Sequence, residues 1–114
     1  ELGANDGLRG FKPAVTKKNL EIIIRRIHAK GAQVLLAGMR APPNMGEDYG
    51  ETFNEIFSNL ADIYQLDFYP FFLDGVASIP ALNQIDGIHP NNLGVRVIVD
   101  KILPTVKHSL EKLR

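Results

Sequence analysis

The chain has 114 residues, of which 45% are hydrophobic and 23% charged, values typical of one modest globular domain. Its 13 basic and 13 acidic residues give a formal net charge of zero, which argues against nucleic acid or an anionic membrane surface as a partner. Cysteine is absent, which excludes disulfides and a thiol nucleophile, and no apolar run reaches the roughly 20 residues of a membrane span.

The first part of the chain predicts a strand, a helix and a second strand. Residues 1–6 ("ELGAND") are interpreted as the end of a buried strand that runs into a glycine-rich loop. Pro13 suits the first turn of a helix, and Gly31 is expected to end it. Apolar residues recur between them at helical spacing: Leu20, Ile23, Ile24 and Ile27. Residues 33–38 ("QVLLAG") then have the length and apolar character of a buried strand.

The second part predicts helix, strand and helix. Residues 49–65 are expected to form a helix with a buried stripe of Phe53, Ile56, Phe57, Leu60 and Tyr64. Residues 67–72 ("DFYPFF") follow as a strand, in which Pro70 restricts hydrogen bonding on one side. After a long connection, Asn91 is the expected N-cap of a last helix, whose apolar positions are Ile98, Ile102, Val106, Leu110 and Leu113. Pro104 should kink or interrupt that helix.

Strands that alternate with helices predict parallel β-α-β units. Because three strands make a narrow sheet, we interpret the chain as the later part of a larger doubly wound α/β domain. Ligands of such sheets gather beyond the carboxyl ends of the strands. The polar residues expected at those ends are Asn5 and Asp6, Arg40 and Asn44, and Asp86 and His89.

The stretch "DGIHPN", residues 86–91, places a carboxylate and an imidazole three residues apart on a predicted turn. A histidine serves as a general base when a carboxylate holds its other nitrogen in the right tautomer, so Asp86 and His89 are candidate catalytic residues. The alternative is a turn-capping aspartate beside an exposed histidine, without chemistry.

Asn5 is a candidate donor to a developing oxyanion, since a side-chain amide at a strand end can stabilise that charge. The alternative is that residues 5–7 form a simple turn, because Asn, Asp and Gly are favoured turn residues.

Three segments together resemble a known family. "GAND" followed by "GLRGF", and then "DGIHPN", are similar to conserved blocks of the SGNH (GDSL-type) hydrolases, in the branch of bacterial arylesterases, acyl-CoA thioesterases and lysophospholipases. "MRAPPNMGEDYGETFNEIF" and "YPFFLDGV" resemble the segments between those blocks, so the resemblance covers essentially the whole chain. It implies a three-layer α/β/α, flavodoxin-like fold with a parallel sheet, of which residues 1–114 are the C-terminal portion of a single domain.

The resemblance also implies roles for individual residues. His89 would be the general base, Asp86 its orienting carboxylate and Asn5 the oxyanion donor, while Asp6 would shape its loop. The residues expected to contact substrate are Leu8, Phe11, Arg40 and Ala41. The implied activity is hydrolysis of small-molecule esters or thioesters without metal or other cofactor, and the implied compartment is the periplasm or the cell exterior, although the sequence itself identifies none.

The family's nucleophilic serine block is not found in this sequence. The chain's three serines are Ser58, Ser78 and Ser109, and none stands in a glycine-flanked strand-to-helix turn. The nucleophile is therefore expected on an N-terminal segment outside this sequence, which could be a separate chain after cleavage. The chain alone is expected to be inactive and poorly stable.

Two alternative functions stay open. One is a non-catalytic α/β interaction module whose site residues are vestigial. The other is a metal-assisted phosphoesterase that uses Asp6, Asp86 and His89, although His28 and His108 are placed on helices away from the strand ends.

Overall fold

Two short parallel strands, β1 (Leu35–Ala37) and β2 (Asp67–Tyr69), form the sheet of the computed structural model, which describes residues 1–113. Leu36 pairs with Phe68 at the centre of the register. The parallel pairing and the strand positions confirm the α/β prediction. The described residues divide into two compact units, Glu1–Phe71 and a second that begins at Phe72.

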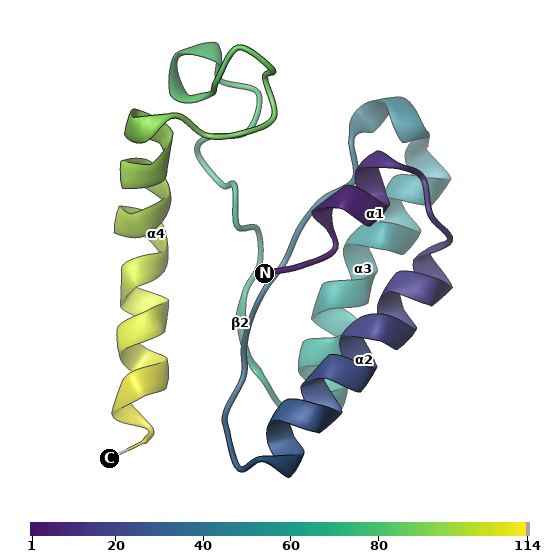
Figure 1. The fold of residues 1–114 in the computed structure, drawn as a ribbon, viewed down its shortest axis with the longest axis vertical. Helices are drawn as coiled ribbons and strands as arrows, with labels where there is room; N and C mark the ends of the chain where they lie inside the picture. Colours follow the sequence, from purple (N-terminus) through teal and green to yellow (C-terminus); the bar gives the residue numbers. More distant parts are fainter. Residues whose placement is uncertain (114) are drawn as a thin grey trace. The chain divides into compact units, whose positions relative to one another are not determined.

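The first unit places helices against this sheet. Helix α2 (Pro13–Ala29) packs along α3 (Glu47–Tyr64), and α3 contacts both strands (Figure 1). The short turn η1 (Pro43–Met45) precedes α3. The core of this unit is apolar and draws on helices and sheet alike: Leu20, Ile24, Leu36, Ala37, Phe53, Ile56, Phe57 and Leu60.

Most predicted features of these helices are confirmed. Pro13 is the first residue of α2, and the N–H groups of Gly31 and Ala32 bond to carbonyls of its last turn, which ends the helix as expected. The predicted stripes are buried only in part, since Ile23 is exposed and Tyr64 half-buried.

The predicted opening strand is wrong. Residues 1–3 pair with neither strand, and Ala4–Leu8 form a short helix, α1. Gly3 carries no side chain and turns the backbone into this helix at φ 103°. Instead of extending a sheet, the segment lies on α3, where a Cβ added to Gly7 would approach the buried Phe53 ring to 2.9 Å.

The second unit consists of a long connection with a short turn, η2 (Pro80–Leu82), and helix α4 (Asn92–Glu111). The loop packs against the helix where Gly94 faces the carbonyl of Leu82 and the fully buried Val76. Pro104 does not interrupt α4, which continues to Glu111. Of the apolar positions predicted on α4, Ile98 is buried, whereas Leu110 and Leu113 are exposed.

Candidate active site

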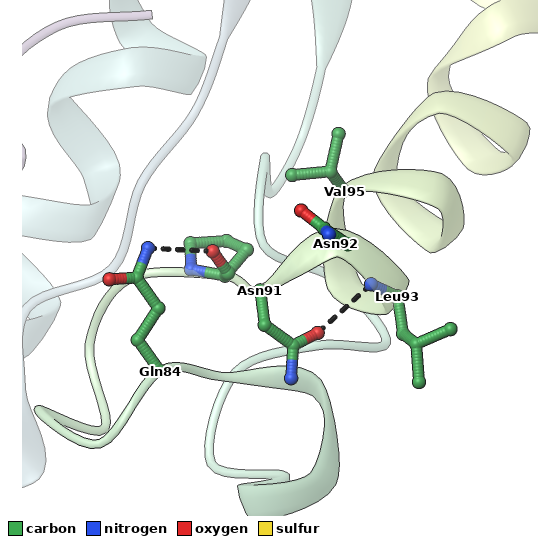
Figure 2. A pocket seen from close by; sticks show the side chains of 6 residues that line it. Gln84, Asn91, Asn92, Leu93 and Val95 are labelled. Atoms are coloured by element: carbon green, nitrogen blue, oxygen red, sulfur yellow. Dashed lines mark hydrogen bonds between the residues drawn. The ribbon is translucent and has the colours of Figure 1, made fainter.

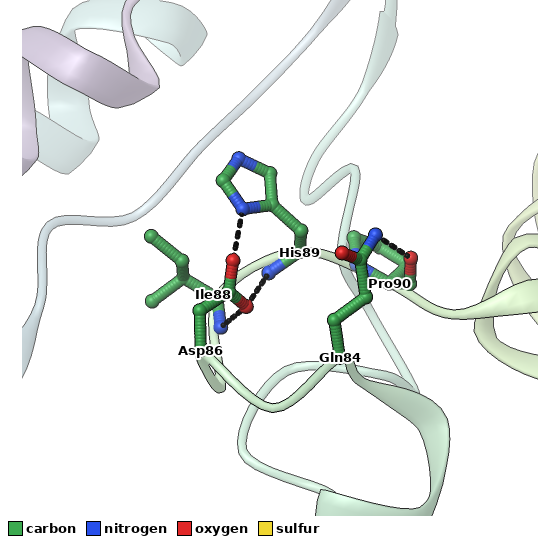
Figure 3. A network of polar contacts seen from close by, with 5 residues as sticks. All are labelled: Gln84, Asp86, Ile88, His89 and Pro90. Carbon is green, nitrogen blue, oxygen red and sulfur yellow. Dashed lines mark hydrogen bonds and ion pairs between the residues drawn. The ribbon is translucent and has the colours of Figure 1, made fainter.

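A closed loop carries the candidate acid–base pair. Gln84 closes the loop through two hydrogen bonds. Its backbone N–H donates to the carbonyl of His89 at 2.7 Å. Its side-chain Nε2 donates to the carbonyl of Pro90 at 3.1 Å (Figure 3). At the tip, Gly87 adopts φ 75°, a left-handed conformation that suits glycine, and its N–H bonds back to Gln84. These bonds hold the ends of residues 84–90 together.

The structure brings Asp86 and His89 into direct contact. Asp86 Oδ2 lies 2.6 Å from His89 Nδ1, while Oδ1 accepts the backbone N–H groups of Ile88 and His89 at 3.0 and 3.1 Å (Figure 3). Both side chains are open to solvent, with 42% of Asp86 and 66% of His89 exposed. In Figure 3 the second ring nitrogen, Nε2, faces away from the carboxylate.

These contacts keep Asp86 ionised. The hydrogen bond from His89, followed by the backbone N–H groups of Ile88 and His89, lowers the Asp86 pKa from 3.8 to about 2. A neutral imidazole beside this carboxylate carries its proton on Nδ1 and leaves a lone pair on Nε2. The pair can therefore accept a proton at the exposed face of the ring.

Asn91 connects the loop to α4. Its side-chain oxygen accepts the N–H groups of Leu93 and Gly94, both at 3.0 Å, which confirms the predicted N-cap. Its side-chain nitrogen donates to the carbonyls of Ala81 and Asn83. One side chain thus joins the start of the helix to the connection that leads to His89.

Hollows lie along the described part of the second unit. One, of about 640 Å³, lies beside the start of α4 and is lined by Gln84, Pro90, Asn91, Asn92, Leu93 and Val95 (Figure 2). Another, of about 350 Å³, includes Ser78 and Gly87. Neither lining includes Asp86 or His89, and we place the candidate site on that pair because its chemistry, rather than the size of a hollow, identifies it.

Asn5 lies on α1 in the first unit, with its side chain exposed. Its neighbour Asp6 accepts a 2.8 Å hydrogen bond from Thr16, which is only 1% exposed. This contact supports the structural role expected for Asp6.

The predicted substrate contacts also lie in the first unit. Leu8 and Phe11 expose 43% and 45% of their surface to solvent. The Arg40 guanidinium stacks over the Phe71 ring at 4.5 Å, and the Ala41 N–H donates to Asn54 Oδ1 at 2.8 Å.

The serines occupy unrelated settings. Ser58 bonds to a carbonyl within α3, Ser109 lies on α4, and Ser78 is a turn residue at φ 64°. Within residues 1–113 no three histidine or carboxylate side chains are grouped closely enough to hold a metal ion.

Sequence reasoning gave no role to Gln84 or to Tyr49, whose hydroxyl bonds to the backbone near α1. Tyr49 and Phe11 are 38 residues apart, and no local pattern marks such a contact. Gln84 could have been suspected only from its closeness to "DGIHPN".

Comparison with known proteins shows that residues 1–97 match the GDSL-like lipase/acylhydrolase family. The chain is 40% identical over 107 residues to the esterase TesA of Pseudomonas aeruginosa and 46% identical over 90 residues to an arylesterase of Vibrio mimicus. The matches cover 94% and 79% of this chain but 53% and 45% of those proteins, so the chain spans about half the length of these relatives.

Solved structures agree with the α/β fold. The structure of TesA superposes with a TM-score of 0.88 at 40% identity, covering 94% of this chain and 59% of that one. The esterase EstA of Pseudoalteromonas gives 0.90 at 32% identity, covering 97% and 61%, and AlinE4, an SGNH-hydrolase family esterase, gives 0.73 at 42%, covering 96% and 58%. Along residues 1–113, no helix combines the length and apolar character needed to cross a membrane.

Proposed function

The chain belongs to the GDSL-like lipase/acylhydrolase family, and from this membership we propose that it is the C-terminal portion of a single SGNH-type ester hydrolase domain. The observation that carries the proposal is the 2.6 Å contact between Asp86 and His89, which leaves His89 Nε2 available as a base. A chain that spans about half of its relatives is expected to share the reaction with residues outside it.

In the proposed mechanism, a serine outside this chain attacks the carbonyl carbon of an ester or thioester. His89 Nε2 takes the serine proton, and Asp86 stabilises the resulting imidazolium. The side-chain amide of Asn5 donates to the oxyanion of the tetrahedral intermediate. His89 then returns the proton to the leaving group, and water, activated by the same imidazole, releases the acid.

The proposed substrates are small carboxylic esters or thioesters. Support comes from the relatives, which are described as an esterase, an arylesterase and a thioesterase/lysophospholipase, the last from Escherichia coli at 40% identity over 112 residues. The exposed apolar side chains of Leu8 and Phe11 suit an acyl chain or aryl group, with Arg40 and Ala41 forming another wall.

The test compares two aspartates in the whole protein that contains this chain. Asp86→Asn removes the charge that orients His89, so kcat for a p-nitrophenyl ester should fall by about 10²- to 10⁴-fold. The matched control is Asp74→Asn, which removes a surface carboxylate 3.2 Å from Lys101 in the same unit and should leave kcat unchanged. Equal effects of the two substitutions would refute the catalytic role of Asp86.

A further inference from the structure

The segment that carries Asn5 is too short to hold its own position. Helix α1 has five residues, and the chain continues through an irregular stretch to Phe11 before α2 begins. Isolated helices of this length are unstable in water, so side chains from elsewhere must fix it. The Thr16–Asp6 hydrogen bond of 2.8 Å is one such contact, made from α2.

Helix α1 packs against helix α3. Gly7 is buried against Phe53, and Phe53 is itself completely buried. The Tyr49 ring stacks on the same phenylalanine, with ring centroids 6.0 Å apart and planes inclined by 15°. Tyr49 thus stands one helical turn before Phe53, beside the face on which α1 lies.

The Tyr49 hydroxyl reaches the backbone of this segment. It donates to the carbonyl of Phe11 at 2.7 Å and lies 3.4 Å from that of Asp6. The Phe11 N–H in turn donates to the Asp6 carbonyl at 3.0 Å. Burial, and secondarily the Asp6 charge, raise the Tyr49 pKa, so the phenol keeps the proton that it donates.

We propose that Tyr49 is a positioning residue for ester hydrolysis. Its hydroxyl holds residues 4–11, the α1 segment, through the Phe11 carbonyl, and thereby keeps the Asn5 amide in position to donate to the oxyanion. The inference rests on the proposed function of Asn5. An oxyanion donor acts only at hydrogen-bond distance from the charge that develops. Loss of the Tyr49–Phe11 hydrogen bond would let the Asn5 amide move, which weakens its hydrogen bond to the oxyanion in the transition state more than any contact in the ground state.

The experiment uses two tyrosine variants of the whole protein. Tyr49→Phe keeps the stack on Phe53 and removes the hydroxyl. Tyr64→Phe is the matched control, because it removes a hydroxyl on the same helix that accepts a hydrogen bond from Arg25 at 2.9 Å, outside the α1 segment. The readouts are kcat and KM for a p-nitrophenyl ester, and hydrogen exchange of the Arg9 and Phe11 amides, which bond to Asn5 and Asp6.

Tyr49→Phe should lower kcat by about 3- to 10-fold with little change in KM and should accelerate exchange of both amides, whereas Tyr64→Phe should do neither. Combined with Asn5→Ala, which alone should cost about 10²- to 10³-fold, Tyr49→Phe should add almost nothing, because the donor it positions is gone. Full additivity of the two losses, or unchanged kcat in Tyr49→Phe, would overturn the inference. Unchanged kcat in Asn5→Ala would instead refute the proposed role of Asn5, and the exchange data would still report whether the hydroxyl fastens the segment.

Discussion

The Asp86 side chain has two tasks in the loop, one for each oxygen. Oδ2 contacts His89 Nδ1, and Oδ1 accepts the N–H groups of Ile88 and His89. The carboxylate that orients the imidazole therefore also folds the backbone from which the imidazole projects. Protonation of Asp86 would weaken both contacts at once.

This double role predicts a pH-dependent loop. The Asp86 pKa is lowered in the folded protein, so its stabilising contribution is complete above the ordinary value of 3.8 and is lost as the pH falls through about 2. The amide resonances of Ile88 and His89, followed by NMR, should shift together with a midpoint near 2. A midpoint near 3.8 would show that these contacts do not form in solution.

For individual side chains, the sequence predicted contacts between residues that are close together in the chain. The spacing of Asp86 and His89 on a turn indicates that their side chains can meet, and the place of Asn91 before an apolar helix predicts a cap; both contacts are observed. Tyr49 was not recognised, because its partner lies 38 residues away and the contact exists only once α1 packs on α3.

Among the elements, α1 departs most from expectation. The sequence "ELGAND" predicts the end of a buried strand that runs into a glycine-rich loop. A strand requires a neighbour for its backbone groups, and residues 1–3 have none in the described sheet. The glycine-containing helix on Phe53 satisfies the backbone within the segment instead.

The continuity of α4 through Pro104 also depends on how a backbone group finds a hydrogen-bond partner. A proline leaves the carbonyl four residues earlier without its N–H donor, here that of Asp100. Asp100 and Pro104 are both exposed, so a water molecule can donate a hydrogen bond to the Asp100 carbonyl and the helix need not end at the proline.

Two glycines of the first unit should respond oppositely to alanine. At Gly7 a Cβ would lie 2.9 Å from the buried Phe53 ring, so Gly7→Ala should destabilise the whole protein by about 1–3 kcal/mol. Gly50 lies within α3 with no neighbouring atom within 4 Å of an added Cβ, and Gly50→Ala should stabilise by about 0.5–1 kcal/mol. Urea unfolding measures both changes, and a Gly7→Ala variant that is as stable as the parent protein would contradict the described packing of α1.

For the molecule as a whole, the family and the α/β fold were predictable because three separated segments resemble it in the right order, and both are confirmed. The complete site was not, because the chain spans about half the length of these relatives. A two-stranded sheet with three residues in each strand also gives little independent stability, which supports the proposal that this chain functions within a longer protein.

The most direct test of the proposed function is to locate the nucleophile in the whole protein. A fluorophosphonate probe reacts with an activated serine hydroxyl, and a solved relative, EstA, is described as inhibited by monoethylphosphonate. Peptide mass mapping after labelling should find one adduct, on a serine outside residues 1–114, and His89→Ala should abolish it. An adduct on Ser58, Ser78 or Ser109, or labelling that persists in His89→Ala, would contradict the assignment of His89 as the base of an ester hydrolase.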